Sequence, residues 1–207
     1  MIAGKRDSPM VAGAILAGGS ARRLGGVAKG LEVVDGMRMV DRVAAALRPL
    51  ATEIVLVGAP TSVAATLPGL RAVGDEFPGA GPLGAIVSAL RATGRDTLVV
   101  AWDMPFVRET VLEALLDAPA DADASVPWTN GQLEPLCAVY RASALGPLSY
   151  AFDGGERSAV AALRKLRLHR VERAFAGRSP FASVNTPEQL AAARAGMQTL
   201  TFPTGPS

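Results

Sequence analysis

The residues near the N-terminus that are best suited to chemistry form a glycine-rich loop with three cations. The loop contains two glycine pairs and three basic residues: Gly18, Gly19, Gly25, Gly26, Arg22, Arg23 and Lys29. Glycine has no Cβ and tolerates φ > 0, so backbone N–H groups in such a loop can approach an anion closely. Because cations surround these amides, a triphosphate is a suitable ligand. The alternative is an ordinary turn with solvated arginines, since the loop contains neither G-x-x-x-x-G-K-[ST] nor G-x-G-x-x-G.

Asp75 and Asp103 are the carboxylates that could act together with this loop. Each follows a short apolar run, and Asp103 is held on a stiff turn before Pro105. Either aspartate could bind Mg²⁺ together with phosphate oxygens, or could cap a turn without any chemical role. A general acid and base pair, as in glycoside hydrolysis, is a weaker interpretation because Arg23 and Lys29 would lower both pKa values.

Composition excludes several other classes of site. The chain has 207 residues, 49% of them hydrophobic, and a net charge of +2, which suits one soluble globular domain and does not indicate nucleic-acid binding. The single cysteine, Cys137, excludes an intrachain disulfide and a cysteine metal cluster, and the single histidine, His169, excludes a multi-histidine zinc centre. The sequence has no G-x-S-x-G motif, so a serine nucleophile also lacks support. Any metal must therefore bind oxygen ligands.

The N-terminal segment 1–9 is polar and predicts a flexible leader. The apolar run after it imitates a secretory signal, but the run is at the short limit and Arg22 and Arg23 follow it. No run approaches the roughly 18 apolar residues of a membrane-spanning helix. We therefore expect a cytoplasmic protein without membrane association, with one domain over residues 10–196 and a tail over residues 197–207.

Strands and helices are predicted to alternate over the first half of the chain. Apolar runs predict strands at 10–16, 53–57, 70–74 and 96–101, and helical periodicity predicts helices at 38–50, 83–92 and 107–116, with a helical turn at 61–67. This alternation predicts an α/β fold of three layers, in which helices cover both faces of a mostly parallel sheet. Ligands of such sheets bind outside the carboxyl ends of the strands. Gly18, Asp75 and Asp103 each follow a predicted strand, so we expect them on one edge, which favours the metal interpretation.

The last third of the chain has a different pattern. Strand-like runs at 124–128 and 133–141 flank Asn130-Gly131, a strong hairpin signal, and predict a small antiparallel hairpin insertion. A helix is predicted at 156–166. Residues 157–178 contain seven arginine or lysine residues against one acid. A solvated face is the default interpretation of this charge, and a rim that meets an anionic substrate is the alternative.

A final helix is predicted to begin at Thr186. Thr186 is a suitable cap, Pro187 suits the first helical position, and Gln189 can complete a capping box. This cap explains Thr186 and Pro187 without any function.

Five motifs together resemble those of one family. They are Leu16-Ala17-Gly18-Gly19-Ser20-Ala21-Arg22-Arg23-Leu24-Gly25-Gly26-x-x-Lys29-Gly30-Leu31, Asp75 with Pro78-Gly79-x-Gly81-Pro82-Leu83-Gly84, Asp103-Met104-Pro105-Phe106-Val107, Pro135-Leu136-x-x-x-Tyr140, and Val184-Asn185-Thr186-Pro187-Glu188-x-Leu190. In order and spacing they are similar to the motifs of the molybdenum cofactor guanylyltransferases, the MobA-like nucleotidyltransferases. The resemblance spans residues 12–194 and depends on the combination, because each motif alone is weak.

The chain departs from the family pattern at four places. Ala28 stands where the family has aspartate before Lys-Gly, Trp102 where it has cysteine before aspartate, Ser183 where it has asparagine, and Val57-Gly58 where it often has asparagine. These departures leave the expected phosphate and metal groups in place. They fall near the expected pterin contacts at Ser183 and the expected nucleoside contacts at Val57, and so bear on the identity of the acceptor.

The resemblance implies a Rossmann-like nucleotidyltransferase fold and the transfer of GMP from Mg²⁺-bound GTP to the terminal phosphate of molybdopterin, with release of pyrophosphate. Gly18-Gly19 favours GTP, because Leu-Ala-Ala-Gly goes with cytosine in the resemblance. The alternatives are a related nucleotidyltransferase that uses CTP or another phosphorylated acceptor, and a non-catalytic nucleotide-binding member. The implied partners are GTP and molybdopterin, with molybdenum-insertion proteins and molybdoenzyme chaperones as further candidates.

The resemblance also implies roles for individual residues. Nucleotide binding is expected at Leu16, Ala17, Gly18, Gly19, Arg23, Lys29, Asp75, Gly81 and Asp103, and catalysis at Arg23, Lys29 and Asp103. Asp103 is the expected ligand of Mg²⁺, with Asp75 as a second candidate, and Asn185 is the expected contact with the acceptor. We expect the side chain of Lys29 at an open rim, where it meets the polyphosphate.

Overall fold

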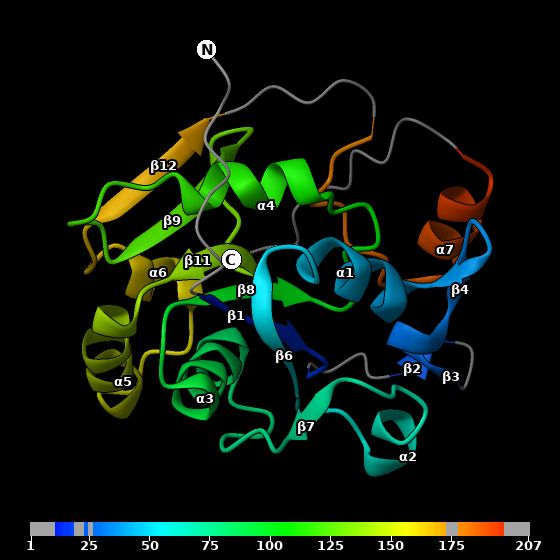
Figure 1. Cartoon of the computed structure of the whole chain (residues 1–207), viewed down its shortest axis with the longest axis horizontal. Coiled ribbons are helices and arrows are strands. Elements are labelled where there is room, and N and C mark those ends of the chain that lie inside the picture. Colours follow the sequence, from blue (N-terminus) through cyan, green and yellow to red (C-terminus); the bar gives the residue numbers. More distant parts are fainter. Residues whose placement is uncertain (1–10, 19–22, 25–26, 173–177, 197–207) are drawn as a thin grey trace.

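A computed structural model of the chain describes residues 11–18, 23–24, 27–172 and 178–196 (Figure 1). Within these ranges the central element is an eight-stranded sheet. Its strands are β1 (Val11–Leu16), β6 (Ala51–Val57), β7 (Arg71–Val73), β8 (Thr97–Ala101), β9 (Ala124–Thr129), β10 (Gln132–Leu133), β11 (Cys137–Tyr140) and β12 (Leu168–Glu172). Their order is β10-β9-β11-β8-β1-β6-β7, and β12 pairs with β9. Strands β8, β1, β6 and β7 are parallel to one another, whereas β11 is antiparallel to β8 and β9.

Helices cover both faces of this sheet (Figure 1). They are α1 (Met39–Leu47), α2 (Thr61–Ala64), α3 (Pro82–Thr93), α4 (Glu109–Leu116), α5 (Leu145–Asp153), α6 (Ala159–Leu163) and α7 (Pro187–Arg194), with the 3₁₀ turns η1 (Lys29–Leu31) and η2 (Ala142–Ala144). Two short antiparallel ribbons pair β2 (Arg23–Leu24) with β3 (Val27–Ala28) and β4 (Val33–Val34) with β5 (Met37–Arg38). Helices α3, α5 and α6 pack on one face of the sheet, and α1 and α4 pack on the other.

Strand β1 is buried on both of its faces. Ala14 and Leu16 belong to the core under α3, whereas Ile15 and the following Ala17 belong to the core under α1 and α4. Central strands of parallel sheets are apolar on both sides, which explains why this strand is a continuous apolar run and does not alternate with polar residues. The predicted three-layer α/β fold is confirmed.

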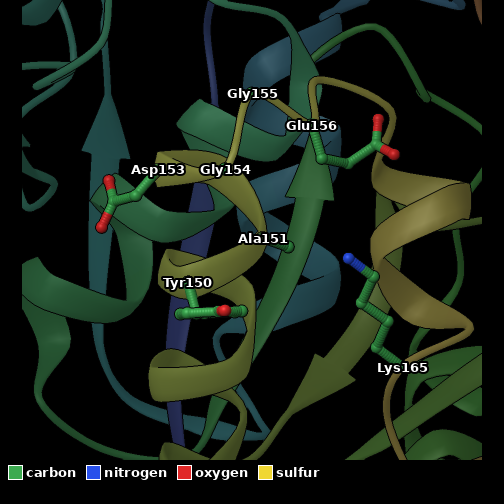
Figure 2. A pocket seen from close by; sticks show the side chains of 7 residues that line it. All are labelled: Tyr150, Ala151, Asp153, Gly154, Gly155, Glu156 and Lys165. Carbon is green, nitrogen blue, oxygen red and sulfur yellow. The ribbon is translucent and has the colours of Figure 1, made fainter.

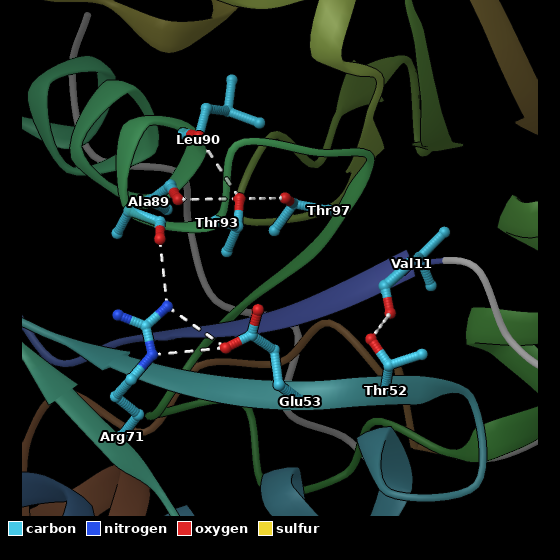
Figure 3. Close-up of polar contacts among 9 residues, drawn as sticks. Val11, Thr52, Glu53, Arg71, Ala89, Leu90, Thr93 and Thr97 are labelled. Carbon is cyan, nitrogen blue, oxygen red and sulfur yellow. Dashed lines mark hydrogen bonds and ion pairs between the residues drawn. The ribbon is translucent and has the colours of Figure 1, made fainter.

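Polar contacts fix the outer strand β7 to its neighbours. Arg71 donates to the carboxylate of Glu53 on β6 at 3.2 Å and to the carbonyl of Ala92 in α3 at 3.0 Å (Figure 3). Close to Ala92, the hydroxyl of Thr93 at the end of α3 lies 2.7 Å from the hydroxyl of Thr97 at the start of β8 (Figure 3). An exposed ion pair such as Arg71–Glu53 contributes only about 0–1 kcal/mol. The main effect of the Arg71 contacts is therefore positional, since the ion pair joins β7 to β6 and the hydrogen bond to Ala92 joins β7 to the end of α3.

The predicted hairpin at Asn130-Gly131 is confirmed. Both residues have positive φ, 52° and 80°, as a type I′ turn requires. The single strand predicted over 133–141 is wrong, because it divides into β10 and β11. A turn at Glu134, whose carbonyl accepts the N–H of Cys137 at 3.1 Å, separates them. Strand β11 then lies between β9 and β8, so the antiparallel part extends the central sheet.

Helix α6 is shorter than the helix predicted over 156–166, since it covers only Ala159–Leu163. Glu156 prevents an earlier start, because its carboxylate accepts the next two backbone N–H groups at 2.8 and 2.7 Å. Ser158 then supplies the cap of α6.

Helix α5 and strand β12 are absent from the prediction. Gly146 and Pro147 at the start of α5 obscure its helical pattern, although proline is acceptable in the first turn of a helix. Strand β12 lies in the basic segment 157–178 and pairs in parallel with β9 along its whole length. It is an edge strand, and edge strands tolerate charged side chains. Its charged residues therefore remove the apolar pattern by which a strand is recognised in the sequence.

The predicted start of the last helix is confirmed. Thr186 Oγ1 accepts the N–H of Gln189 at 3.2 Å, Gln189 Oε1 accepts the N–H of Thr186 at 3.1 Å, and Pro187 follows the cap. The predicted leader, residues 1–9, and the predicted tail, residues 197–207, lie outside the described residues. None of the helices in the described ranges has the length and apolarity that a membrane span needs.

Candidate active site

The carboxyl ends of the parallel strands meet at one edge of the sheet. Backbone hydrogen bonds join the segments there: Ala17 N–H to Val57 C=O at 2.9 Å, Trp102 N–H to Leu16 C=O at 3.1 Å, and Gly58 N–H to Val73 C=O at 3.0 Å. The loops that follow β1, β6, β7 and β8 therefore begin side by side. The structure brings Gly18, Asp75 and Asp103 to this edge, as predicted from the position of each residue just after a strand.

Lys29 lies within this edge, in the turn η1. Its ammonium forms an ion pair with Oδ2 of Asp103 and a hydrogen bond with Oδ1 of Asn185. The side chain of Lys29 is 5% exposed and that of Asp103 is 13% exposed. The expected open rim is wrong for Lys29, because the segment before α7 lies against Asp103. There the N–H of Val184 donates to the carbonyl of Asp103 at 2.9 Å.

Burial makes this ion pair sensitive to the loss of either partner. Two charges removed from water need further hydrogen bonds to offset their desolvation, and Asn185 provides one of them. Removing one member of such a pair typically costs about 3–5 kcal/mol, because the other charge stays buried without compensation. Within the described ranges Lys29 uses two of the three N–H donors of its ammonium, which leaves one donor for a ligand.

Trp102 and Gly30 pack closely beside this ion pair. A Cβ added to Gly30 would lie 2.7 Å from Cδ2 and 3.0 Å from Cζ3 of the indole. Trp102 is 2% exposed and belongs to the core under α1 and α4. The indole therefore packs against Gly30, which follows Lys29 in the chain, and Trp102 itself directly precedes Asp103. Sequence reasoning noted Trp102 only as a departure from the family pattern, and no sequence signal indicates the contact.

Asp75 is oriented by the loop after β7. Its Oδ1 accepts the hydroxyl of Ser88 and the N–H of Phe77, each at 3.0 Å. Its Oδ2 faces Gly18, where an added Cβ would lie 3.7 Å away. One carboxylate oxygen is thus used by the fold and the other faces the glycine-rich loop. Ser88, which fixes this orientation from α3, was missed by sequence reasoning because the residues on either side of it, from Leu83 to Leu90, are apolar.

Asp75 and Asp103 lie at the same edge of the sheet but do not belong to one group of interacting side chains in the described part of the chain. Within the described ranges, no hydrogen bond or ion pair joins Asp75 to Lys29 or to Asp103. The same ranges contain no group of three or more histidine, cysteine, aspartate or glutamate side chains that could hold a metal ion. A Mg²⁺ ion at Asp103 would therefore take much of its coordination from phosphate oxygens and water, as is usual for this ion.

Gly81 stands at the start of α3 in a conformation that favours glycine, with φ of +86°. A Cβ there would lie 3.3 Å from the carbonyl of Arg157, in the loop before α6. Pro82 follows near the first helical position of this twelve-residue helix. A helix N-terminus carries partial positive charge that favours an anion, so the position suits the nucleotide role predicted for Gly81.

The glycine-rich loop is described only in part. Leu16 and Ala17 are 4% and 0% exposed, so a contact with nucleotide there would come from the backbone. The N–H of Ala17 already donates to the end of β6, and this amide is therefore engaged in the fold. Gly19 lies outside the described residues. Arg23 belongs to β2, and its side chain is also outside the described part.

Glu134 is a partly buried acid that sequence reasoning overlooked. Burial raises its pKa to about 7. It stands two residues before Leu136, whose carbonyl accepts the N–H of Ala101 at the end of β8, at 2.8 Å.

Asp123, which precedes β9, has a pKa shifted in the opposite direction from that of Glu134. A hydrogen bond from Arg167, 2.7 Å long, holds the pKa of Asp123 well below its usual range.

A separate concavity of about 650 Å³ lies at the end of α5 (Figure 2). It is lined by Tyr150, Ala151, Asp153, Gly154, Gly155, Glu156 and Lys165. Figure 2 shows the amine of Lys165 directed toward the loop of Glu156 and the carboxylate of Asp153 directed away. The mixed charges do not single out one kind of ligand. None of the residues predicted to bind nucleotide lines this concavity.

Known sequences resemble this chain over most of its length. The family profile described as "MobA-like NTP transferase domain" matches residues 13–171. A probable molybdenum cofactor guanylyltransferase of Chloroflexus aggregans is 40% identical over 163 residues, which are 76% of this chain and 78% of that protein. A molybdenum cofactor guanylyltransferase of Desulfosudis oleivorans is 31% identical over 197 residues, which are 91% of this chain and 96% of that protein.

A solved structure agrees with these sequence matches. Molybdopterin-guanine dinucleotide biosynthesis protein A from Archaeoglobus fulgidus superimposes with a TM-score of 0.71 and 28% identity, over 89% of this chain and 97% of that chain. The agreement confirms the nucleotidyltransferase fold and the resemblance carried by the five motifs. The chain belongs to the MobA-like NTP transferase family.

Proposed function

We propose that this chain transfers GMP from GTP to the terminal phosphate of molybdopterin, releasing pyrophosphate and forming the guanine dinucleotide. The observation that carries the proposal is Lys29, buried between Asp103 and Asn185 at the carboxyl edge of the sheet. The names of two relatives, molybdenum cofactor guanylyltransferases at 40% and 31% identity, support guanine as the base and the molybdenum cofactor as the acceptor.

The reaction joins two anions, so repulsion between them is its main obstacle. A phosphate monoester has a second pKa of about 6 and is mostly dianionic at neutral pH, which means that the acceptor needs no strong base. Phosphoryl-transfer sites act chiefly by positioning their substrates and neutralising charge. In this role Lys29 offers its remaining N–H donor to the polyphosphate. We assign Arg23 to neutralising the negative charge of the same polyphosphate.

The donor groups at Asp103 suit Mg²⁺. Oxygen atoms of Asp103 and Asn185 converge on one cation, the Lys29 ammonium, and Mg²⁺ prefers hard oxygen ligands of this kind. When it is bound with the triphosphate, Mg²⁺ supplies neutralisation of the phosphate charge. The carboxylate of Asp103 would hold it, and Asp75, whose Oδ2 faces Gly18, is the second candidate.

A product assay tests the proposal. The protein is incubated with molybdopterin, Mg²⁺ and each of the four nucleoside triphosphates in turn, and the products are identified by mass spectrometry. The expected result is the guanine dinucleotide together with pyrophosphate from GTP, and no pyrophosphate when molybdopterin is left out. A cytosine dinucleotide from CTP, or binding of GTP without any product, would contradict the proposal.

A further inference from the structure

The ammonium of Lys29 occupies a position that is suited to a cation. Two oxygen atoms from separate segments converge on it, Oδ2 of Asp103 after β8 and Oδ1 of Asn185 before α7. Lys29 itself comes from a third segment, the turn η1. Its side chain is 5% exposed, so this contact is unlike the many surface ion pairs that contribute little.

We propose that Asp103 and Asn185 form a divalent-cation site that the ammonium of Lys29 occupies until the nucleotide arrives. This inference rests on the proposed function and adds Asn185, the expected acceptor contact, to the cation site. Its consequence is an order of binding. The nucleotide-free protein does not take up free Mg²⁺, and the metal enters together with the triphosphate.

Free Mg²⁺ would have to displace the ammonium in order to reach Asp103. The displaced charge would then be buried beside a dication, and within the described ranges Asp103 is the acid with which Lys29 pairs. A buried charge without a partner is strongly unfavourable. Mg²⁺ also gives up its hydration shell reluctantly. Exchange of the two cations therefore does not occur unless another anion is present.

A triphosphate supplies that anion. Among the residues that the structure describes, no partner takes the third N–H donor of Lys29, so a phosphate oxygen can bind it before the contacts with Asp103 and Asn185 are broken. The ammonium then follows the polyphosphate, and the two oxygen atoms become available to the metal that is already bound to the phosphates. Each charge keeps a partner throughout this exchange.

Titration of the full chain with Mn²⁺ alone, followed by electron paramagnetic resonance, tests whether Lys29 occupies the cation site and keeps free metal out of it. Lys29→Met keeps most of the length of the side chain and removes its charge, and we expect this variant to bind Mn²⁺ at least tenfold more tightly than the wild type. Adding Asp103→Asn to Lys29→Met should abolish the gain, and adding Asn185→Ala should reduce it. Lys165→Met is the matched control, because this exposed lysine lines the separate concavity, and it should bind Mn²⁺ as the wild type does.

Folding of the variants is monitored by circular dichroism. Mn²⁺ should raise the Tm of Lys29→Met and leave the Tm of the wild type unchanged. If Lys29→Met does not fold, Asn185→Asp addresses the same question. This variant places a second carboxylate beside the retained ammonium, so one acid can pair with Lys29 and the other can bind the metal. It should therefore bind free Mn²⁺ at least tenfold more tightly than the wild type.

Equal affinity for Mn²⁺ in the wild type and in these variants, whether tight or too weak to measure, would overturn the inference. The titrations contain neither GTP nor molybdopterin, so their outcome does not depend on turnover. If guanylyl transfer fails but the expected Mn²⁺ pattern is found, the proposed function is rejected and the cation site occupied by Lys29 stands.

Discussion

Replacement of Gly30 by alanine is expected to destabilise the protein through Trp102. The added Cβ would lie 2.7 Å from Cδ2 and 3.0 Å from Cζ3 of the indole, whereas carbon atoms pack at about 3.5–4.0 Å. The ring would have to move by roughly 1 Å, and Trp102, at 2% exposure, has no solvent-filled space to enter. Overpacking of this kind costs about 1–3 kcal/mol. We expect the free energy of unfolding, measured in urea, to fall by that amount.

A double-mutant cycle separates this clash from other effects of the substitution. Trp102→Cys removes the ring, so Gly30→Ala should cost less than about 0.5 kcal/mol in that background. Gly146→Ala is the control, because it lies in α5 with nothing within 4 Å of the added Cβ. It should be neutral or stabilise by up to about 1 kcal/mol, since glycine is a poor helix former. The packing argument is refuted if Gly30→Ala costs the same with and without the indole.

Three further predictions concern charge and base recognition. Asp103→Asn should lower turnover at least about tenfold, the scale of a 1.4 kcal/mol change in barrier, and should raise the Mg²⁺ requirement; wild-type kinetics would show that the carboxylate only supports the fold. GTP should bind at least about tenfold more tightly than CTP in calorimetry, because polar groups matched to guanine are left unpaired by cytosine; equal affinities would contradict the guanine assignment. Burial raises the pKa of Glu134 from 4.5 to about 7, so the folded chain holds this proton more tightly than the unfolded chain, and wild-type stability falls as the pH rises through that range. Glu134→Gln should therefore match the wild type at low pH and gain up to about 2 kcal/mol above pH 7, allowing for partial exposure; urea unfolding at both ends of the range checks this, and a difference that does not change with pH would argue against it.

The common edge of Gly18, Asp75 and Asp103 could be predicted from the sequence because it depends on few facts. Each residue follows a short apolar run that is recognisable locally. Parallel pairing then directs the ends of these strands to the same side, whatever the details of packing. The hairpin at Asn130-Gly131 and the cap at Thr186 could be predicted for a similar reason, since each is determined by neighbouring residues.

The burial of Lys29 could not be predicted in this way. It depends on Asn185, which is 156 residues away in the chain, and local patterns do not report such contacts. Locally Asn185 is only the residue before a helix cap, where its N–H donates to Oε1 of Gln189 at 2.5 Å. The resemblance assigned Lys29 and Asn185 to different substrates, and so gave no reason to expect a contact between them.

Synthesis on the ribosome completes the cation site late. Lys29 is made soon after β1, but Asn185 is added 156 residues later. At about 5–20 residues per second, a new Lys29 waits roughly 8–30 s for its partner. During this time β1, β6 and β8 are already available to pair, whereas the ammonium has neither its amide partner nor its final burial. The growing chain can therefore pair the parallel strands β1, β6, β7 and β8 well before it acquires a site able to exchange the ammonium for a metal.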